Sequence, residues 1–202
     1  MRLRMGASLC PPRRRYAGGM TVVIRPATPG DAVALASVAA VTFPLACPPH
    51  TTEEAKAAFI ATVLSAERFG EYTVDPERRL LVAEDAAGEV IGYTMVNLGE
   101  PADADVRAAL RVRPTAELSK CYVLPGHHGE GVAGRLMEAS LAAAAAAGAE
   151  GIWLGVNEEN ARAQRFYGKH GFERVGSKRF LVGDRLEDDW VMERALVSPP
   201  RP

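Results

Sequence analysis

The chain has 202 residues, of which 48% are apolar and 24% are charged, and its formal net charge is -1. These proportions are ordinary for a globular domain and exclude a collagen-like or wholly disordered chain. A charge so close to zero gives no reason to expect a nucleic acid as partner. The length predicts one domain with an appendage.

Charge is distributed unevenly at the N-terminus. Five of the 24 basic residues and none of the 25 acidic residues lie in residues 1–19, so the rest of the chain carries a formal charge of -6. Prolines and glycines in this segment disfavour a helix, and it has no apolar run long enough for a secretory signal. We expect residues 1–19 to be a disordered extension or the product of a mis-assigned start upstream of Met20. An Arg-rich targeting segment is the alternative.

Neither membrane insertion nor disulfide bonding is expected. The alanine-rich stretch 139–149 is much shorter than the roughly 20 residues that cross a bilayer. The three cysteines, Cys10, Cys47 and Cys121, are odd in number and widely spaced. This pattern favours a reducing compartment, and the expected location is cytoplasmic.

Strands and helices are expected to alternate from residue 21 onward. The apolar patterns predict strands over 21–25, 79–84, 90–98, 117–123, 152–156, 172–182 and 188–194. They predict helices over 31–41, 51–64, 103–110, 132–147 and 161–170, the first capped by Asp31 and the second opened by a capping box of Thr51 and Glu54. The acidic run 187–189 suggests a hairpin turn. The fold class is therefore α/β (α+β) with one mixed sheet, over residues 20–197, followed by a frayed tail at 198–202.

A glycine-rich turn joins the strand 117–123 to the helix 132–147. It contains Gly126, Gly129 and Gly131, and Gly134 follows. Glycines let successive backbone amides converge on an anion, and the helix adds the positive end of its dipole, so a phosphate or pyrophosphate is the expected ligand. A turn that needs glycine for its geometry alone is the alternative. The turn has no Lys-Ser/Thr of a P-loop, and no acid follows strand 152–156 as in a dinucleotide-binding unit.

Two segments resemble the signatures of the GNAT superfamily of acetyl-CoA-dependent N-acetyltransferases. The run ELSKCYVLPGHHGEGVAGRLM resembles its motif A, whose Q/R-x-x-G-x-G/A loop corresponds to residues 128–133. The run NARAQRFYGKHGF resembles its second signature. The likeness covers about residues 21–196 and implies a single GNAT-like domain with a mixed, mostly antiparallel sheet flanked by helices. His128 departs from the family's usual Gln or Arg, which makes that side-chain contact weaker or pH-dependent.

The resemblance implies acetyl-CoA as cosubstrate and a track of residues that binds it. The pyrophosphate would lie on the loop and helix start, formed by His128, Gly129, Glu130, Gly131, Val132, Ala133 and Gly134. The pantetheine would pair with the main chain of Cys121, Tyr122 and Val123, where an amide can also hold the developing oxyanion. Asn160 would serve as helix N-cap and cofactor contact.

Glu117 and Tyr167 are the candidate catalytic residues. By the period-2 rule, Glu117 shares a face of its strand with Ser119 and Cys121, and its position matches the base glutamate of histone-type members. Tyr167 is the expected general acid, since a phenol with a pKa of about 10 can protonate the CoA thiolate. The alternatives are that Glu117 is a strand-end glutamate exposed to water and that Tyr167 is an aromatic residue of the core. Gly155 occupies the position where N-terminal-amine acetyltransferases carry a glutamate.

The sequence thus predicts acetyl transfer to a primary amine of a small molecule, by direct attack in a ternary complex. Cys121 has no evident histidine partner that would make it a covalent nucleophile. Residues 166–196 resemble PaiA-type spermidine/spermine acetyltransferases, which together with the acidic body suggests a polyamine. The histidines lack metal-ligand spacing, so no metal is expected, and a homodimer stays open. The alternative function is a non-catalytic CoA-binding regulatory or interaction module on the same fold.

Overall fold

The computed structural model describes residues 22–182 and 185–196. The expectations for residues 1–19 and 198–202 lie outside the described residues. Within them, the strands and helices follow the predicted order, with one helix added.

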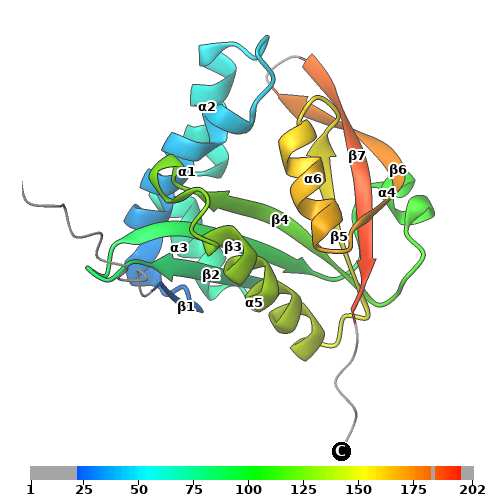
Figure 1. The fold of residues 1–202 in the computed structure, drawn as a ribbon. Coiled ribbons are helices and arrows are strands. Elements are labelled where there is room, and N and C mark those ends of the chain that lie inside the picture. Colours follow the sequence, from blue (N-terminus) through cyan, green and yellow to red (C-terminus); the bar gives the residue numbers. More distant parts are fainter. Residues whose placement is uncertain (1–21, 183–184, 197–202) are drawn as a thin grey trace, which may run out of the picture.

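A seven-stranded sheet in the order β1-β2-β3-β4-β5-β7-β6 organises the domain (Figure 1). The strands are β1 (Val23–Pro26), β2 (Arg78–Glu84), β3 (Val90–Leu98), β4 (Thr115–Val123), β5 (Gly151–Asn157), β6 (Glu173–Val182) and β7 (Arg185–Ala195). Every neighbouring pair is antiparallel except β4 and β5, which run parallel. The predicted mixed, mostly antiparallel sheet is confirmed.

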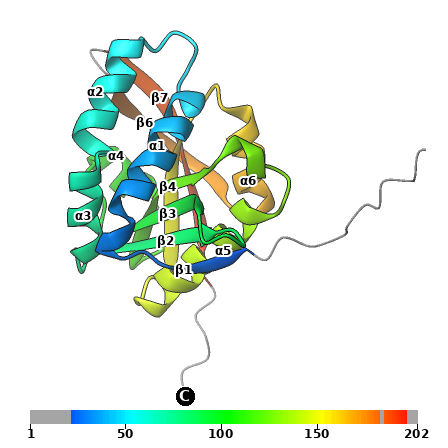
Figure 2. The ribbon, with the colours of Figure 1, turned by 90° about the vertical axis from the view of Figure 1, so that its left-hand side faces the viewer.

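Helices cover both faces of this sheet. They are α1 (Ala32–Ala46), α2 (Glu53–Val63), α3 (Ala66–Val74), α4 (Ala104–Ala109), α5 (Val132–Ala146) and α6 (Ala161–Lys169). Figure 2 shows α1 to α4 on one side of the sheet and α5 and α6 on the other. The buried side chains agree, because α1 and α3 pack on one core cluster with Met95, whereas α5 and α6 pack on another with Leu118.

Two helix predictions need correction. Helix α3 is absent from the predicted elements, because its nine residues are mostly polar and Phe69 is the buried one among them. The cap of α2 is Thr52, whose hydroxyl accepts a hydrogen bond from Ala55 N at 3.1 Å. Thr51, the predicted cap, is buried instead. Adjacent threonines offer the same capping chemistry, so the sequence does not distinguish them.

One helical stretch among the described residues, Pro29–Ala46, is long and apolar enough to cross a membrane by length and composition alone. The prediction made from residues 139–149 overlooked it. Core helices of globular domains pass the same test. Here Leu35, Val38 and Phe43 are buried against the sheet and α3.

Asp31 belongs to an ionic network at the start of the sheet and makes no capping bond to α1. Its carboxylate accepts hydrogen bonds from Arg25 at 2.7 and 2.8 Å and from Thr28 N at 2.7 Å. Arg25 also bonds to Glu84 on β2 at 2.5 Å. The hydrogen bonds from Arg25 hold the pKa of Asp31 well below its usual range. The network therefore joins β1, β2 and the entry to α1.

We expect Asp31→Asn to lower the free energy of unfolding at pH 7 by about 1–2 kcal/mol, since Arg25 is partly exposed and its ion pair is screened. Because the folded pKa of Asp31 is depressed, its contribution is complete above the ordinary carboxyl pKa of about 4 and is lost as the pH falls through the folded value. Urea unfolding of both proteins at pH 7 and pH 3 should therefore show a smaller difference at pH 3. Glu89→Gln is the control, and a pH-independent difference would contradict the assignment.

Candidate active site

The parallel strands β4 and β5 pair over only three residues. Thr115 to Glu117 lie opposite Gly151 to Trp153. Beyond these residues β4 continues to Val123 and β5 continues to Asn157, but the two strands no longer pair with each other. A cavity of about 590 Å³ is lined by the unpaired parts of both strands. The edge of β4 that faces β5 therefore leaves backbone groups available to a ligand.

β4 carries a bulge at Ser119. The consecutive β3 residues Met95 and Val96 pair with Lys120 and Leu118, so Ser119 has no partner in β3. An extra residue in one strand interrupts the alternation of side chains between the two faces of the sheet. Positions on either side of Ser119 therefore no longer follow a period of two.

The bulge distributes the β4 side chains over two halves of the cavity. Cys121 packs against the core under α5 and α6. Lys120 and Glu117 pair with Met95 and Asn97, and Met95 belongs to the core under α1 and α3. Glu117 and Lys120 therefore share the α1 face. The expectation that Glu117 shares a face with Cys121 is wrong, because it assumed an unbroken strand.

The turn after β4 presents a row of backbone amides. Gly129 and Gly131 have φ values of 90° and 79°, in the left-handed region that glycine favours. In the described part of the chain, none of the amides of residues 129–134 donates to a protein acceptor, and the helical ladder begins with Arg135 N and Gly131 O at 3.1 Å. These amides and the positive end of the α5 dipole fit a pyrophosphate.

The side chains of this loop contribute less to an anion site than its backbone. His128 Nε2 donates to the Val123 carbonyl oxygen at 3.0 Å, which holds the ring against β4 and occupies one of the predicted pantetheine acceptors. His127 Nδ1 bonds to Glu130 Oε2 at 3.0 Å. Val132 is fully buried in the core, so it offers a ligand only its amide.

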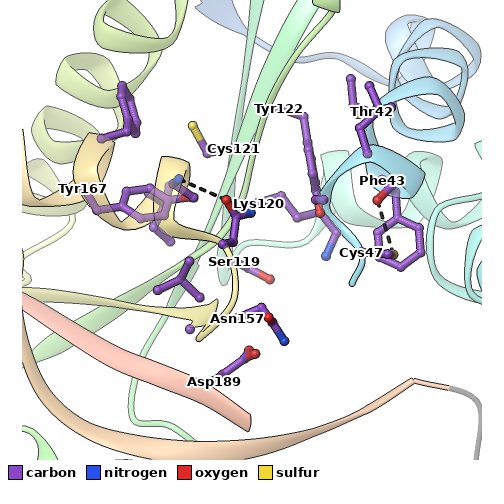
Figure 3. A pocket seen from close by; sticks show the side chains of 18 of the residues that line it. Thr42, Phe43, Cys47, Ser119, Lys120, Cys121, Tyr122, Asn157, Tyr167 and Asp189 are labelled. Atoms are coloured by element: carbon purple, nitrogen blue, oxygen red, sulfur yellow. Dashed lines mark hydrogen bonds between the residues drawn. The ribbon is translucent and has the colours of Figure 1, made fainter. Parts of the chain in front are cut away.

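The cavity brings together most of the predicted site residues. Those that line it are Glu117, Cys121, Tyr122, Val123, His128, Ala133, Asn160 and Tyr167. The others form the turn and the first residues of α5: Gly129, Glu130, Gly131, Val132 and Gly134. Figure 3 shows Cys121 and Tyr167 on one side of the cavity and Thr42, Phe43 and Cys47 on the other.

Tyr167 projects from α6 with its ring against Phe166 and Phe172, at centroid distances of 5.5 and 5.9 Å. Burial raises the pKa of Tyr167 well above its ordinary value, so the hydroxyl remains a proton donor at neutral pH. Burial also raises the pKa of Cys121 to about 12, which keeps its thiol protonated and opposes a nucleophilic role. Asn160 caps α6 through Oδ1, which accepts from Ala163 N at 3.0 Å.

A series of polar contacts orients Glu117. Asn97 Nδ2 donates to Glu117 Oε2 at 2.8 Å, and Arg78 donates to Asn97 Oδ1 at 3.0 Å. Asp75 accepts from Arg78 Nε at 2.9 Å. Among the described residues none donates to Glu117 Oε1, so one carboxylate oxygen is available to a substrate proton.

The polar residues on the wall formed by the C-terminal strands are not among the predicted site residues. Asp189 lies within β7, in agreement with the predicted strand 188–194 and not with the suggested hairpin turn, and pairs with Asn157 of β5 and Lys178 of β6. A Cβ on Gly155 would lie 2.5 Å from Lys178 Cε and 3.2 Å from Asp189 Oδ2. The missing side chain at Gly155 thus gives these two residues room beside the cavity. A charged residue in the middle of a strand was the available signal.

An apolar wall closes the cavity on the side of α1 and α2. The rings of Phe43 and Phe59 stack there, with centroids 4.5 Å apart and an interplanar angle of 11°. Leu45 and Val63 extend this wall. The sequence identifies these residues as apolar helix positions, but the space between two helices is set by tertiary packing.

Comparison with known proteins agrees with this architecture. The profile of the acetyltransferase (GNAT) family matches residues 42–172. An uncharacterized N-acetyltransferase of Mycobacterium tuberculosis is 49% identical over 167 residues, which cover 83% of this chain and 99% of the relative. The PaiA N-acetyltransferase of Thermoplasma acidophilum in complex with coenzyme A aligns with a TM-score of 0.68 at 21% identity, over 87% of this chain and 99% of that chain. Spermidine/spermine N-acetyltransferase SpeG of Vibrio cholerae aligns with a TM-score of 0.58 at 20% identity, over 87% and 92%.

The amide row can be tested with Gly131→Val. The left-handed conformation of Gly131, with a φ of 79°, would cost a valine about 1–2 kcal/mol. The valine side chain would also enter the open space beside the loop. We expect the affinity for coenzyme A, measured by calorimetry, to fall about tenfold or more. The matched control is Gly148→Val at the other end of α5, where φ is 92° and the space is equally open. Equal affinities in the two variants would exclude the loop as the pyrophosphate site.

Proposed function

Because this chain belongs to the acetyltransferase (GNAT) family, we propose that it transfers the acetyl group of acetyl-CoA to a primary amine of a small molecule by direct attack in a ternary complex. The observation that carries the proposal is the cavity between β4 and β5. Glu117 and Tyr167 line it from different elements, and the amide row of α5 follows directly on β4.

Acetyl-CoA fits the features on the α5 and α6 side of this cavity. The amide row would bind the pyrophosphate, and the unpaired edge of β4 would bind the pantetheine as an added strand does. Asn160 and Ala163 line this side from the start of α6. An amide near Val123 would stabilise the oxyanion that develops on the thioester carbonyl.

The amine must lose a proton before or during its attack. An alkylamine with a pKa of about 10.4 is only about 0.04% neutral at pH 7, which corresponds to about 4.6 kcal/mol. Glu117 Oε1 is the acceptor for that proton, because Asn97 binds the other oxygen. The amine nitrogen then bonds to the thioester carbonyl carbon as the carbon–sulfur bond breaks.

The thiolate of CoA leaves with the bonding electron pair, and Tyr167 is the donor that protonates it. Its position on the Cys121 side of the cavity agrees with the predicted path of the pantetheine along β4. Attack by Cys121 is disfavoured because its thiol is held protonated. The non-catalytic alternative leaves both the oriented carboxylate of Glu117 and the protonated Tyr167 without a role.

The narrower predictions are still to be tested. Two observations favour a polyamine acceptor. Residues 166–196 resemble PaiA-type spermidine/spermine acetyltransferases, and one structural neighbour is named a spermidine/spermine acetyltransferase. The charges on the cavity wall do not favour a polyamine, since the basic residues Lys120, Arg162 and Lys178 outnumber Glu117 and Asp189 there. The homodimer, the cytoplasmic location and the absence of a metal requirement remain predictions.

Tyr167→Phe tests the general acid. It keeps the ring packing and removes the hydroxyl, so kcat should fall between about 10- and 1,000-fold, in the lower half of that range because a thiolate is a fair leaving group. The melting temperature should change little. Tyr93→Phe is the control, since it removes a buried hydroxyl that has no hydrogen-bond partner and lies outside the cavity lining. Wild-type turnover in Tyr167→Phe, measured by release of free thiol, would exclude the role.

Glu117→Gln tests the base. Activity should fall at neutral pH and recover in part above pH 9, where more free amine exists. The readout is the pH profile of kcat/KM, with Glu89→Gln as the control for loss of a carboxylate elsewhere. A profile parallel to wild type would show that a water relay or desolvation removes the proton, which leaves the acetyltransferase proposal in place.

A further inference from the structure

Lys120 is a lysine on the cavity wall for which the proposed reaction has no use. In the described chain it forms no hydrogen bond and no ion pair within 4.0 Å. The charged groups that face it are Glu117 on its own strand and Arg78 on β2. Burial lowers the pKa of Lys120 to about 8, so the ammonium is retained at pH 7 although it is poorly solvated. The side chain of Lys120 is only partly exposed, and charges withdrawn from water are normally paired, which indicates that a partner is supplied by a ligand.

The bulge at Ser119 sets Lys120 beside the predicted base. Glu117 and Lys120 pair with Asn97 and Met95, which lie two residues apart on one strand, so both side chains leave β4 on the α1 face. A carboxylate and an ammonium are thus presented together on the acceptor side of the cavity. Cys121 and Tyr167 lie on the opposite, coenzyme side.

The remaining walls of this half of the cavity are apolar or electrically balanced. Phe43 and Phe59 form a stacked aromatic surface. Lys178 and Asp189 are cross-strand partners and both lie next to Gly155. The half of the cavity beneath α1 and α2 therefore has no excess of negative charge for a multiply charged cation such as a polyamine.

We propose that the acceptor is an amino-acid-like zwitterion, whose amine lies at Glu117, whose carboxylate pairs with Lys120 and whose apolar remainder packs against Phe43 and Phe59. This inference rests on the proposed function and adds the class of acceptor to it. The reaction is unchanged: the amine forms the amide bond, its proton goes to Glu117, and CoA leaves as the thiol. Lys120 is a specificity residue that holds a part of the acceptor that does not react.

The test compares acceptors that differ only in the carboxylate. L-Phenylalanine is paired with 2-phenylethylamine, L-methionine with 3-(methylthio)propylamine, and spermidine is added as the polyamine. In the wild-type enzyme kcat/KM should be about 10- to 100-fold higher for each carboxylate-bearing member, the range expected for a charge-assisted contact. Spermidine should be the poorest acceptor.

Lys120→Met should remove this preference through KM, so that kcat/KM falls about 10- to 100-fold more for each carboxylate-bearing acceptor than for its partner without a carboxylate. Lys120→Arg, which keeps the cation, should retain part of it. Lys56→Met is the matched control, because Lys56 is paired with Glu53 on α2 and lies outside the cavity lining. The melting temperature of Lys120→Met should equal or exceed that of wild type, since a partly buried charge without an ion-pair partner among the described residues has been removed.

Calorimetry on the CoA-loaded protein gives a readout that does not depend on turnover. Phenylalanine should bind more tightly than phenylethylamine, and this difference should vanish in Lys120→Met. A preference that survives Lys120→Met, or a wild-type preference for spermidine, would overturn the zwitterion assignment while acetyl transfer itself stands. Carboxylate-dependent binding without turnover of any amine would instead contradict the proposed function and leave the assignment of Lys120 in place.

Discussion

The site depends on the early end of pairing between β4 and β5. Three pairs of residues hold these strands together, and after Glu117 and Trp153 they diverge. Unpaired backbone groups on a strand edge require partners from water, protein or a ligand. Here the gap is too wide for a direct pair and is occupied by a cavity of about 590 Å³. An extended ligand with amide groups can restore on β4 the hydrogen bonds that β5 no longer supplies.

The bulge at Ser119 adds a second constraint, because it separates the chemistry into two halves. In an unbroken strand, Glu117 and Cys121 would face the same side, and the proposed base would compete with the coenzyme for space. The extra residue moves Cys121 to the side of α6 and leaves Glu117 and Lys120 on the side of α1. In the proposed reaction, the amine therefore approaches the thioester from the face opposite to Tyr167. One backbone irregularity thus places the proposed base and the proposed acid on different sides of the cavity.

Local signals in the sequence predicted most of the fold. The glycine turn before α5, the cap at Asn160 and the apolar strands depend on neighbouring residues, so the sequence alone is enough to place them. The bulge is different, since a period-2 pattern cannot report a residue that drops out of register with a partner more than twenty positions away. Helix α3 was not predicted, because Phe69 is the one buried residue in it. The sequence includes Asp189 both in the predicted strand 188–194 and in the suggested turn 187–189, and only the pairing of β7 with β5 and β6 shows that it lies beside the cavity.

The charge balance of the acceptor side connects these features to substrate choice. The sequence outside residues 1–19 is acidic overall, which by itself favours a cationic acceptor. Long-range attraction acts on the approach of a substrate, however, and salt screens it over about 8–10 Å. Inside the cavity, contacts with individual groups decide the affinity for a substrate, and Lys120 lines the cavity just as Glu117 does. A polycation would have to leave that ammonium unpaired and add its own positive charge beside it. A zwitterion supplies an opposite charge to both Glu117 and Lys120, so every charge that binding removes from water gains a partner.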